Sequence, residues 1–234
     1  MIVNLSASAP ELSSLKGEVR IVEPDRIGRS IARRSAEIRA TVPQLELSAD
    51  ADASAALALA RERDCSLTAI LVRACANALT QSPWANAAYR DGRFELYSRV
   101  NVGVSFHSED ALATPAVLDA AAKSLSELGS ELERLRARAQ AGELTPPELA
   151  GTTFTFTDLG EYPAVHRYAP LITPPQAAAV AVGAVRNIPV VRDGVVVAGS
   201  VITVSLACDH RILYGARAGD FLEKIVTNVE DPQP

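Results

Sequence analysis

One stretch near the C-terminus, residues 201–215, constrains this chain more than any other. It opens with VITVSLACD, a run of mostly β-branched and apolar residues that is typical of a buried strand. The run then breaks into a polar turn that Gly215 closes. His210 stands at the break, where a core strand would hold its backbone and a cleft could receive its side chain. The pattern therefore predicts a histidine presented at the end of a core strand.

The position of His210 alone allows two interpretations. Imidazole takes up and releases a proton near neutral pH, which suits a general base. A lone histidine between Asp209 and Arg211 is also what the polar end of an ordinary strand looks like. Spacing alone favours this second interpretation and leaves the first open.

Longer motifs favour the interpretation of His210 as a general base. Residues 209–215, DHRILYG, resemble the Asp-His-Arg-x-x-Asp-Gly signature of the catalytic domain of 2-oxo acid dehydrogenase dihydrolipoyl acyltransferases, which is related in fold to chloramphenicol acetyltransferase. The likeness continues upstream, in the order that the family uses, through GTTFTFTDLG, APLITPPQAA, Val182-Gly183 and PVVRDG. It can be followed from Asp25 to Pro232.

The resemblance implies both a fold and a site. The fold is α/β of the chloramphenicol acetyltransferase type, an α+β two-layer sandwich with a mixed β-sheet covered by helices. His210 would be the general base, and the hydroxyl of Thr157 would stabilise the oxyanion of a tetrahedral intermediate. The supporting residues that it implies are Arg211, Asp158, Gly215 and, in an expected opening helix, Arg34.

Tyr214 is the main departure from the family signature, which has Asp at this position. Loss of that orienting carboxylate would leave a buried arginine unpaired unless its partner also changes. Either Tyr214 supplies a substitute support, or the site has decayed and the protein is a catalytically degenerate trimeric scaffold. Family members form the active site between subunits, so the resemblance implies a homotrimer in which His210 of one subunit meets Thr157 of the next.

Length and linkers predict one large domain. Residues 1–24 lack periodicity and are expected to form an irregular N-terminal arm, and residues 25–234 a single acyltransferase catalytic domain. The chain has no Ala- and Pro-rich linker and no Asp-Lys-Ala lipoylation loop, so we expect no lipoyl or partner-binding domain on it.

That expectation decides the predicted substrates. We expect acetyl-CoA as acyl donor and a hydroxyl of a small molecule as acceptor, in the biosynthesis of a natural product such as a tetronate. Two alternatives stay open: the degenerate scaffold, and a dehydrogenase-complex core that uses lipoyl domains in trans. The CoA-binding residues are not identified.

Charge and composition exclude other classes. A net charge of -5 and a pI near 5.3 give no basic surface for nucleic acid. No signal peptide and no apolar run of ~20 residues is present, so we expect a cytoplasmic protein without membrane contact. Cys65, Cys75 and Cys208 lack the spacing of metal ligands, which predicts reduced thiols and no metal site.

Periodicity and capping residues predict the elements. Helices are expected over residues 25–40, 53–63, 66–81 and 124–140, with Ser66 as an N-cap and Gly142 as a stop. Strands are expected over residues 42–52, 100–106 and 201–209, and a tight turn at Asp91-Gly92.

Overall fold

The computed structural model describes residues 17–108 and 111–233, and its contacts divide the chain into two compact units, residues 1–34 and 35–234. In the first unit, residues 17–25 have no regular structure. Helix α2 (Arg26–Thr41) follows, and Asp25 caps it by accepting a 2.6 Å hydrogen bond from the Gly28 amide. The predicted arm is therefore irregular where it is described, while residues 1–16 lie outside the described part. The predicted domain of residues 25–234 stays a prediction, since the compact unit starts at Ser35.

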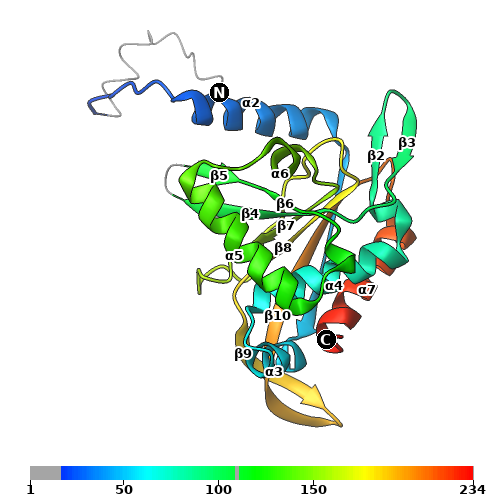
Figure 1. The fold of residues 1–234 in the computed structure, drawn as a ribbon. Helices are drawn as coiled ribbons and strands as arrows, with labels where there is room; N and C mark the ends of the chain where they lie inside the picture. Colours follow the sequence, from blue (N-terminus) through cyan, green and yellow to red (C-terminus); the bar gives the residue numbers. More distant parts are fainter. Residues whose placement is uncertain (1–16, 109–110, 234) are drawn as a thin grey trace, which may run out of the picture. The chain divides into compact units, whose positions relative to one another are not determined.

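The second unit is built on an eight-stranded mixed sheet with the order β1-β10-β8-β7-β4-β5 (Figure 1). β6 pairs with β4, and β9 pairs with β10. β7 lies parallel to β4 and β8, and the other pairs among the described strands are antiparallel. The strands are β1 (Gln44–Asp52), β4 (Val102–Ser108), β5 (Ala111–Ala113), β6 (Ala116–Val117), β7 (Phe154–Asp158), β8 (Ala178–Val182), β9 (Arg186–Arg192) and β10 (Val195–Asp209).

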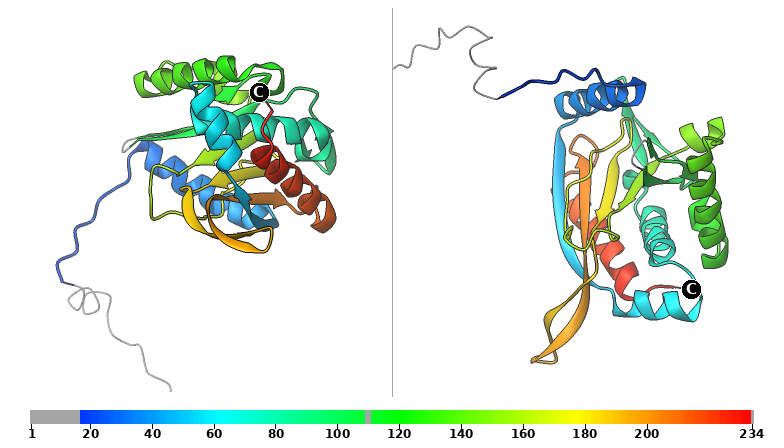
Figure 2. Two further views of the ribbon diagram at one scale, coloured as in Figure 1. Left: turned by 90° about the horizontal axis from the view of Figure 1, so that it is seen from below. Right: turned by 90° about the vertical axis from the view of Figure 1, so that its left-hand side faces the viewer.

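Helices cover one face of this sheet, as Figures 1 and 2 show. They are α3 (Ser54–Glu62), α4 (Leu67–Gln81), α5 (Leu125–Ala141) and α7 (Gly215–Glu230), together with the short α6 (Pro146–Ala150). Alternate strand residues such as Phe154, Phe156 and Leu206 belong to the core on this side and are fully buried. A helical layer packed on a mixed sheet is the two-layer fold that the sequence predicts.

The opposite face of the sheet carries small and hydroxyl side chains. Strand register places five of them on one level across the sheet: Ser48, Ser205, Ala181, Thr157 and Ser105. The irregular segment 159–177 contributes Ile172, which is fully buried against Ala207 and Val42. Ser205 and Thr157 on this face are also buried, although they are polar.

Most predicted elements are confirmed, with one clear difference. Ser66 caps α4, Ser124 forms a capping box with Glu127 at the start of α5, and Gly142 ends that helix in the left-handed conformation. Positive φ angles at Asp91 and Gly92 make the predicted turn between β2 (Ala87–Arg90) and β3 (Arg93–Leu96).

The difference lies in β10, which starts at Val195 instead of residue 201. Its first part pairs with β9 in a hairpin closed by Asp193 and Gly194, and this hairpin extends beyond the rest of the sheet (Figures 1 and 2). Pro189 is tolerated in β9 because, among the described strands, β9 pairs with β10 alone and forms an edge. In the described ranges, no helix is long and apolar enough to span a bilayer, and no group of side chains could hold a metal ion.

Candidate active site

The turn after β10 holds His210 at the surface, as predicted. The amide of His210 donates to the Pro43 carbonyl over 2.9 Å, which ties the turn to the residue before β1. Asp209 is 2% exposed, and its carboxylate accepts hydrogen bonds from the backbone and guanidinium of Arg211. Its carbonyl accepts from the amides of residues 212 and 213. The His210 imidazole is exposed, and it makes no hydrogen bond to the part of the chain that the structure describes.

Arg211 also fastens the turn to the β2–β3 hairpin. Its guanidinium lies over the ring of Tyr89, 4.5 Å from the centroid, and Tyr89 packs on Phe94. Hydrogen bonding to Asp209 raises the pKa of Arg211, so it remains a cation. The supporting role that the resemblance implies for Arg211 stays a prediction. Its contact with Tyr89 joins residues that are distant in sequence, and no motif indicated it.

Among the described residues of one chain, the Tyr214 hydroxyl makes no hydrogen bond that could take over the role of the aspartate in the family signature. It is 49% exposed, and the described residues offer its hydroxyl no partner. Its ring lies 5.0 Å from the guanidinium carbon of Arg217, which in turn lies 4.5 Å above the ring of Trp84. Gly215 begins α7, and a Cβ there would meet nothing within 4 Å, so packing within the chain does not require glycine at this position.

Thr157 lies in β7 on the face opposite the helices. Its hydroxyl donates to Ser105 Oγ over 3.2 Å, and Ser105 shares a 3.1 Å hydrogen bond with Thr114. Asp158, the next residue, accepts hydrogen bonds from the Thr68 hydroxyl at 2.8 Å and the Gly160 amide at 2.7 Å. Asp158 is therefore a structural acceptor at the end of the strand.

A cavity of about 680 Å³ opens beside the end of β7. It is lined by Ser105, Phe106, Arg136, Asp158, Gly183 and Ile202, among others. Its walls combine apolar side chains with a hydroxyl, a carboxylate and a guanidinium, a mixture common in sites for small ligands. The cavity thus reaches Ser105, the residue that accepts the hydrogen bond of Thr157.

One chain does not bring Thr157 and His210 together. Thr157 is level with Ala181 and Ser205, two strands away, and His210 follows Ser205 by five residues. At about 3.3 Å per residue and about 4.8 Å per strand, the offset is roughly 16 Å along the strands and about 10 Å across them. The two positions are therefore on the order of 19 Å apart and cannot contact the same small group. Arg34, the remaining predicted residue, is exposed on α2.

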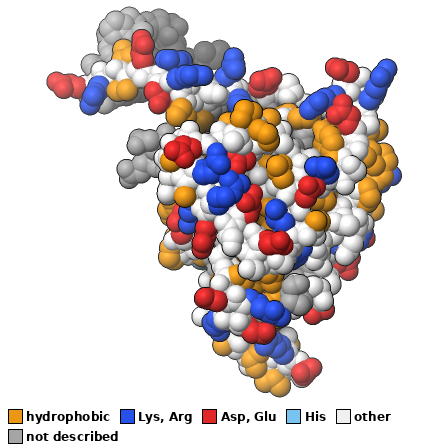
Figure 3. Space-filling view, viewed as in Figure 1, with side chains coloured by type: hydrophobic (Ala, Val, Ile, Leu, Met, Phe, Trp, Pro, Cys, Tyr) orange, Lys and Arg blue, Asp and Glu red, His pale blue; other side chains and the backbone are white. Residues whose placement is uncertain are grey.

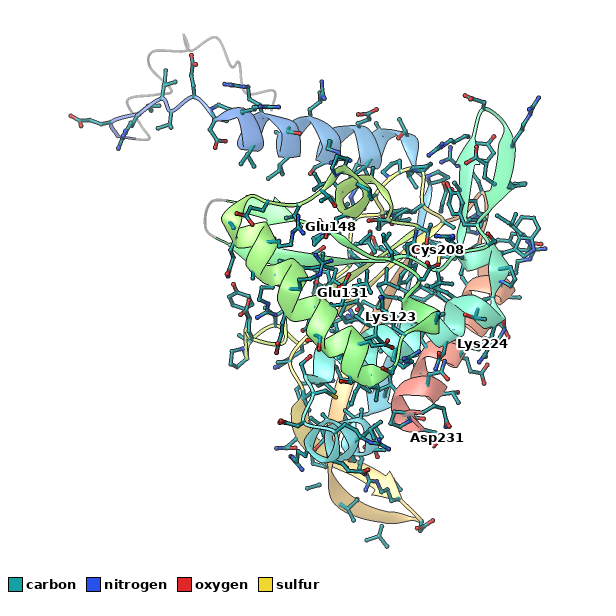
Figure 4. The ribbon with its side chains drawn as sticks, in the orientation of Figure 1. Lys123, Glu131, Glu148, Cys208, Lys224 and Asp231 are labelled. Atoms are coloured by element: carbon teal, nitrogen blue, oxygen red, sulfur yellow. The ribbon has the colours of Figure 1, made fainter. Side chains whose placement is uncertain are left out.

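The cysteines take no part in this site. Cys208 is fully buried under the helices (Figure 4), and burial raises the pKa of its thiol to about 12. Since the thiolate is the reactive form, Cys208 is not a nucleophile at neutral pH.

Comparisons with known proteins agree on one family. Residues 16–234 match the family described as 2-oxoacid dehydrogenases acyltransferase (catalytic domain). The chain is similar to the dihydrolipoyllysine-residue acetyltransferase components of the pyruvate dehydrogenase complexes of Rickettsia conorii (30% identity over 92% of this chain and 54% of that protein) and Zymomonas mobilis (32% over 98% and 54%). It thus spans about half the length of these curated relatives.

Solved structures give the same fold. The dihydrolipoamide acetyltransferase of Azotobacter vinelandii superposes with a TM-score of 0.84 at 22% identity, covering 98% of both chains. A chloramphenicol acetyltransferase superposes with a TM-score of 0.51 at 16% identity, covering 81% of this chain and 84% of the other. The predicted fold class is confirmed.

Proposed function

The chain belongs to the family of 2-oxoacid dehydrogenase acyltransferase catalytic domains, and from this membership we propose that it transfers an acyl group between coenzyme A and a dihydrolipoyl group. The observation that carries the proposal is the match to acetyltransferase components of pyruvate dehydrogenase complexes over 92% or more of the chain. The sequence led us to expect a small-molecule hydroxyl as acceptor, but the comparisons do not support that acceptor. We therefore propose a dihydrolipoyl thiol in its place. The dihydrolipoyl group would be a substrate presented by another domain. Acetyl-CoA would be the thioester that exchanges its acetyl group with it.

His210 and Thr157 would divide the chemistry of this transfer. The His210 imidazole takes the proton of the attacking thiol, and the resulting sulfur attacks the thioester carbonyl carbon. Negative charge then develops on the carbonyl oxygen, where the Thr157 hydroxyl can donate a hydrogen bond. When the intermediate collapses, the C–S bond to the second thiol breaks and that sulfur takes the proton from His210.

This mechanism needs His210 and Thr157 from different subunits, because roughly 19 Å separates them in one chain. We therefore propose the homotrimer that the family resemblance implies. Work on the Azotobacter vinelandii enzyme concerns a serine, a histidine and an asparagine in its catalytic mechanism, in that order along the chain. Thr157, His210 and Tyr214 follow the same order here, which supports their assignment to the site.

The cavity at the end of β7, lined in part by α4 and α5, suits the proposed substrates in size. Coenzyme A and lipoyl-lysine both present the reacting sulfur at the end of a long narrow arm. A cavity of about 680 Å³ can hold such an arm. Its lining includes Ser105, which accepts the hydrogen bond of Thr157, but not Thr157 itself.

The test is a thiol-release assay with acetyl-CoA, offering dihydrolipoamide in one series and small alcohols in another. We expect turnover with dihydrolipoamide and a loss of at least ~10²-fold in His210→Ala. Turnover with an alcohol but not with dihydrolipoamide would replace the proposal with the small-molecule acetyltransferase.

A scaffold without catalysis is the second candidate, favoured only by Tyr214. It predicts no turnover with any acceptor and no binding of coenzyme A by calorimetry. Binding of coenzyme A together with turnover that depends on His210 would eliminate it.

A further inference from the structure

The hydroxyl of Tyr168 is buried without a hydrogen-bond partner of ordinary geometry among the described residues, and the Thr157 side chain is near it. Tyr168 belongs to the irregular segment that covers the polar face of the sheet. Its hydroxyl oxygen is inaccessible to solvent, and no described residue makes a hydrogen bond of ordinary geometry with it. A buried phenol without a partner destabilises a fold, so packing alone gives no reason for a hydroxyl here.

Backbone hydrogen bonds hold the irregular segment that contains Tyr168 against the end of β8. The Leu159 amide donates to the Val182 carbonyl at 3.0 Å, and the Ala184 amide donates to the Val165 carbonyl at 2.8 Å. At Gly183 the approach is so close that a Cβ would lie 2.3 Å from the Val165 carbonyl oxygen. Tyr168 follows three residues after this contact, and its neighbour Arg167 donates to Ser48 Oγ at 3.1 Å, so the segment is also held next to Tyr168.

The Tyr168 hydroxyl keeps its proton and can therefore donate a hydrogen bond near Thr157. Burial raises the pKa of Tyr168, and a contact with the Thr157 side chain offsets only part of that rise. The phenol therefore stays protonated across the neutral range. Ala181, which separates Thr157 from Ser205 on their level of the sheet, adds only a methyl group at this place.

The proposed role of Thr157 requires a change of hydrogen bonds. Its hydroxyl now donates to Ser105 Oγ. To donate to an oxyanion instead, it must turn its hydrogen away from Ser105, while its oxygen keeps lone pairs that can accept. A second donor within reach would strengthen the Thr157 hydroxyl at that moment.

We propose that Tyr168 is a positioning residue of the oxyanion site, whose hydroxyl donates to the Thr157 oxygen when Thr157 donates to the thioester oxygen. This role rests on the proposed acyl transfer. It deepens the site by adding a residue that acts through Thr157 and does not itself touch the substrate.

The test is Tyr168→Phe, which removes only the oxygen. We expect kcat to fall about tenfold, less than the ~10²-fold cost of losing one direct oxyanion donor, with KM unchanged. The melting temperature should not fall, because the lost hydroxyl has no partner in the resting fold. Tyr162→Phe, in the same segment but 49% exposed, is the matched control and should change neither quantity.

A double variant distinguishes action through Thr157 from an independent effect. In a Thr157→Val background, which keeps the β-branched shape, Tyr168→Phe should cause no further loss of kcat. Two outcomes would overturn the role of Tyr168 and leave the proposed function standing. One is that the wild type turns over and Tyr168→Phe has the same kcat. The other is that the losses of the two single variants multiply in the double variant. A wild-type protein without acyl transfer would overturn the proposed function and this role with it.

Discussion

At the start of α7, a tyrosine occupies the position where a helix usually carries a capping side chain. Tyr214 has the extended backbone of an N-cap, with φ −104° and ψ 154°, but its side chain makes no capping hydrogen bond. Asp or Asn there could accept from an amide of the first turn, as the Asp in the family signature could. The substitution thus removes both a carboxylate and a cap next to His210.

We predict that Tyr214→Asp is more stable than Tyr214→Ala by about 1 kcal/mol, because aspartate restores the cap. Both variants lose the contact of the ring with Arg217, so their difference reports the cap together with the charge of the aspartate near Arg217 and the helix N-terminus. Urea unfolding gives the two free energies. Equal stabilities would show that the first turn of α7 does not depend on a cap.

The thiols offer a second prediction at this scale. Burial raises the pKa of Cys75 and Cys208 to about 12 and also raises that of the partly exposed Cys65. We expect the folded protein to react at no more than Cys65 with a thiol reagent at pH 8, and the unfolded protein to react at all three cysteines. Rapid reaction of Cys208 in the folded state would show that its thiol is accessible to solvent.

The sequence predicted some site residues and missed others for a physical reason. His210, Asp209 and Arg211 are adjacent, so one motif reveals them. Tyr89 and Tyr168 reach the site through contacts between distant segments, which depend on strand register and loop path. No local pattern carries that information.

Among the elements, the segment that covers the polar face depends on a close approach at Gly183. A Cβ there would lie 2.3 Å and 2.5 Å from the carbonyl oxygens of Val165 and His166. We predict that Gly183→Ala destabilises the fold by about 2–3 kcal/mol and lowers activity, because the backbone over Thr157 must move. Thermal unfolding and the thiol-release assay measure the two effects.

Gly219→Ala is the matched control for this prediction. A Cβ at Gly219 would meet nothing within 4 Å, and alanine in a helix is more stable than glycine by about 0.5–1 kcal/mol. If Gly183→Ala and Gly219→Ala both stabilised the protein, the close packing of residues 159–177 at the end of β8 would be refuted.

Helices α5 and α6 are joined by charges that titrate in acid. Charged side chains of both signs gather on the exposed side of α5 (Figure 3), where Arg134 pairs with Glu131 and, at 2.9 Å, with Glu148. Figure 4 labels the two glutamates. Hydrogen bonds from Thr145, with smaller effects of the arginines, lower the pKa of Glu148 to about 2 from an ordinary 4.5. Because the folded pKa is the lower one, this stabilisation is present above pH 4.5 and is lost as the pH falls towards 2.

We predict that Glu148→Gln is less stable than wild type by about 1–2 kcal/mol at pH 7, and that the difference shrinks between pH 4.5 and 2. Glutamine can keep the capping hydrogen bonds, so the loss reports the charge. Exposed Glu133→Gln is the control and should change little. A difference independent of pH would assign the effect to packing.

Elements were predictable where local chemistry marks their ends. Ser66, Ser124 and Gly142 each act through hydrogen bonds or dihedral angles within a few residues. The start of β10 was missed because residues 195–200 belong to a strand only through pairing with β9. The path of residues 159–177 over the sheet follows from tertiary packing, for which their irregular sequence gives no periodic signal.

At the scale of the whole molecule, the single chain exposes two features that an assembly would use. Valines 191, 195 and 196 near the tip of the β9–β10 hairpin are 60–70% exposed, and apolar side chains gather there in Figure 3. Thr157 and His210 lie roughly 19 Å apart, too far to act on one thioester within a chain. Both features favour the proposed trimer, in which a neighbour completes each site.

Mixing two inactive variants tests that arrangement. His210→Ala and Thr157→Val should each lose nearly all activity, since every site lacks one group. In trimers assembled at random from equal amounts of both, about a quarter of the sites would combine an intact His210 from one chain with an intact Thr157 from the next, so activity should return to about a quarter of wild type. If both residues acted within one chain, no site in the mixture could be whole and activity would stay at the level of the single variants. Light scattering on the same samples, with a mass of three chains expected, shows whether an inactive mixture reflects failed assembly or a site contained in one subunit.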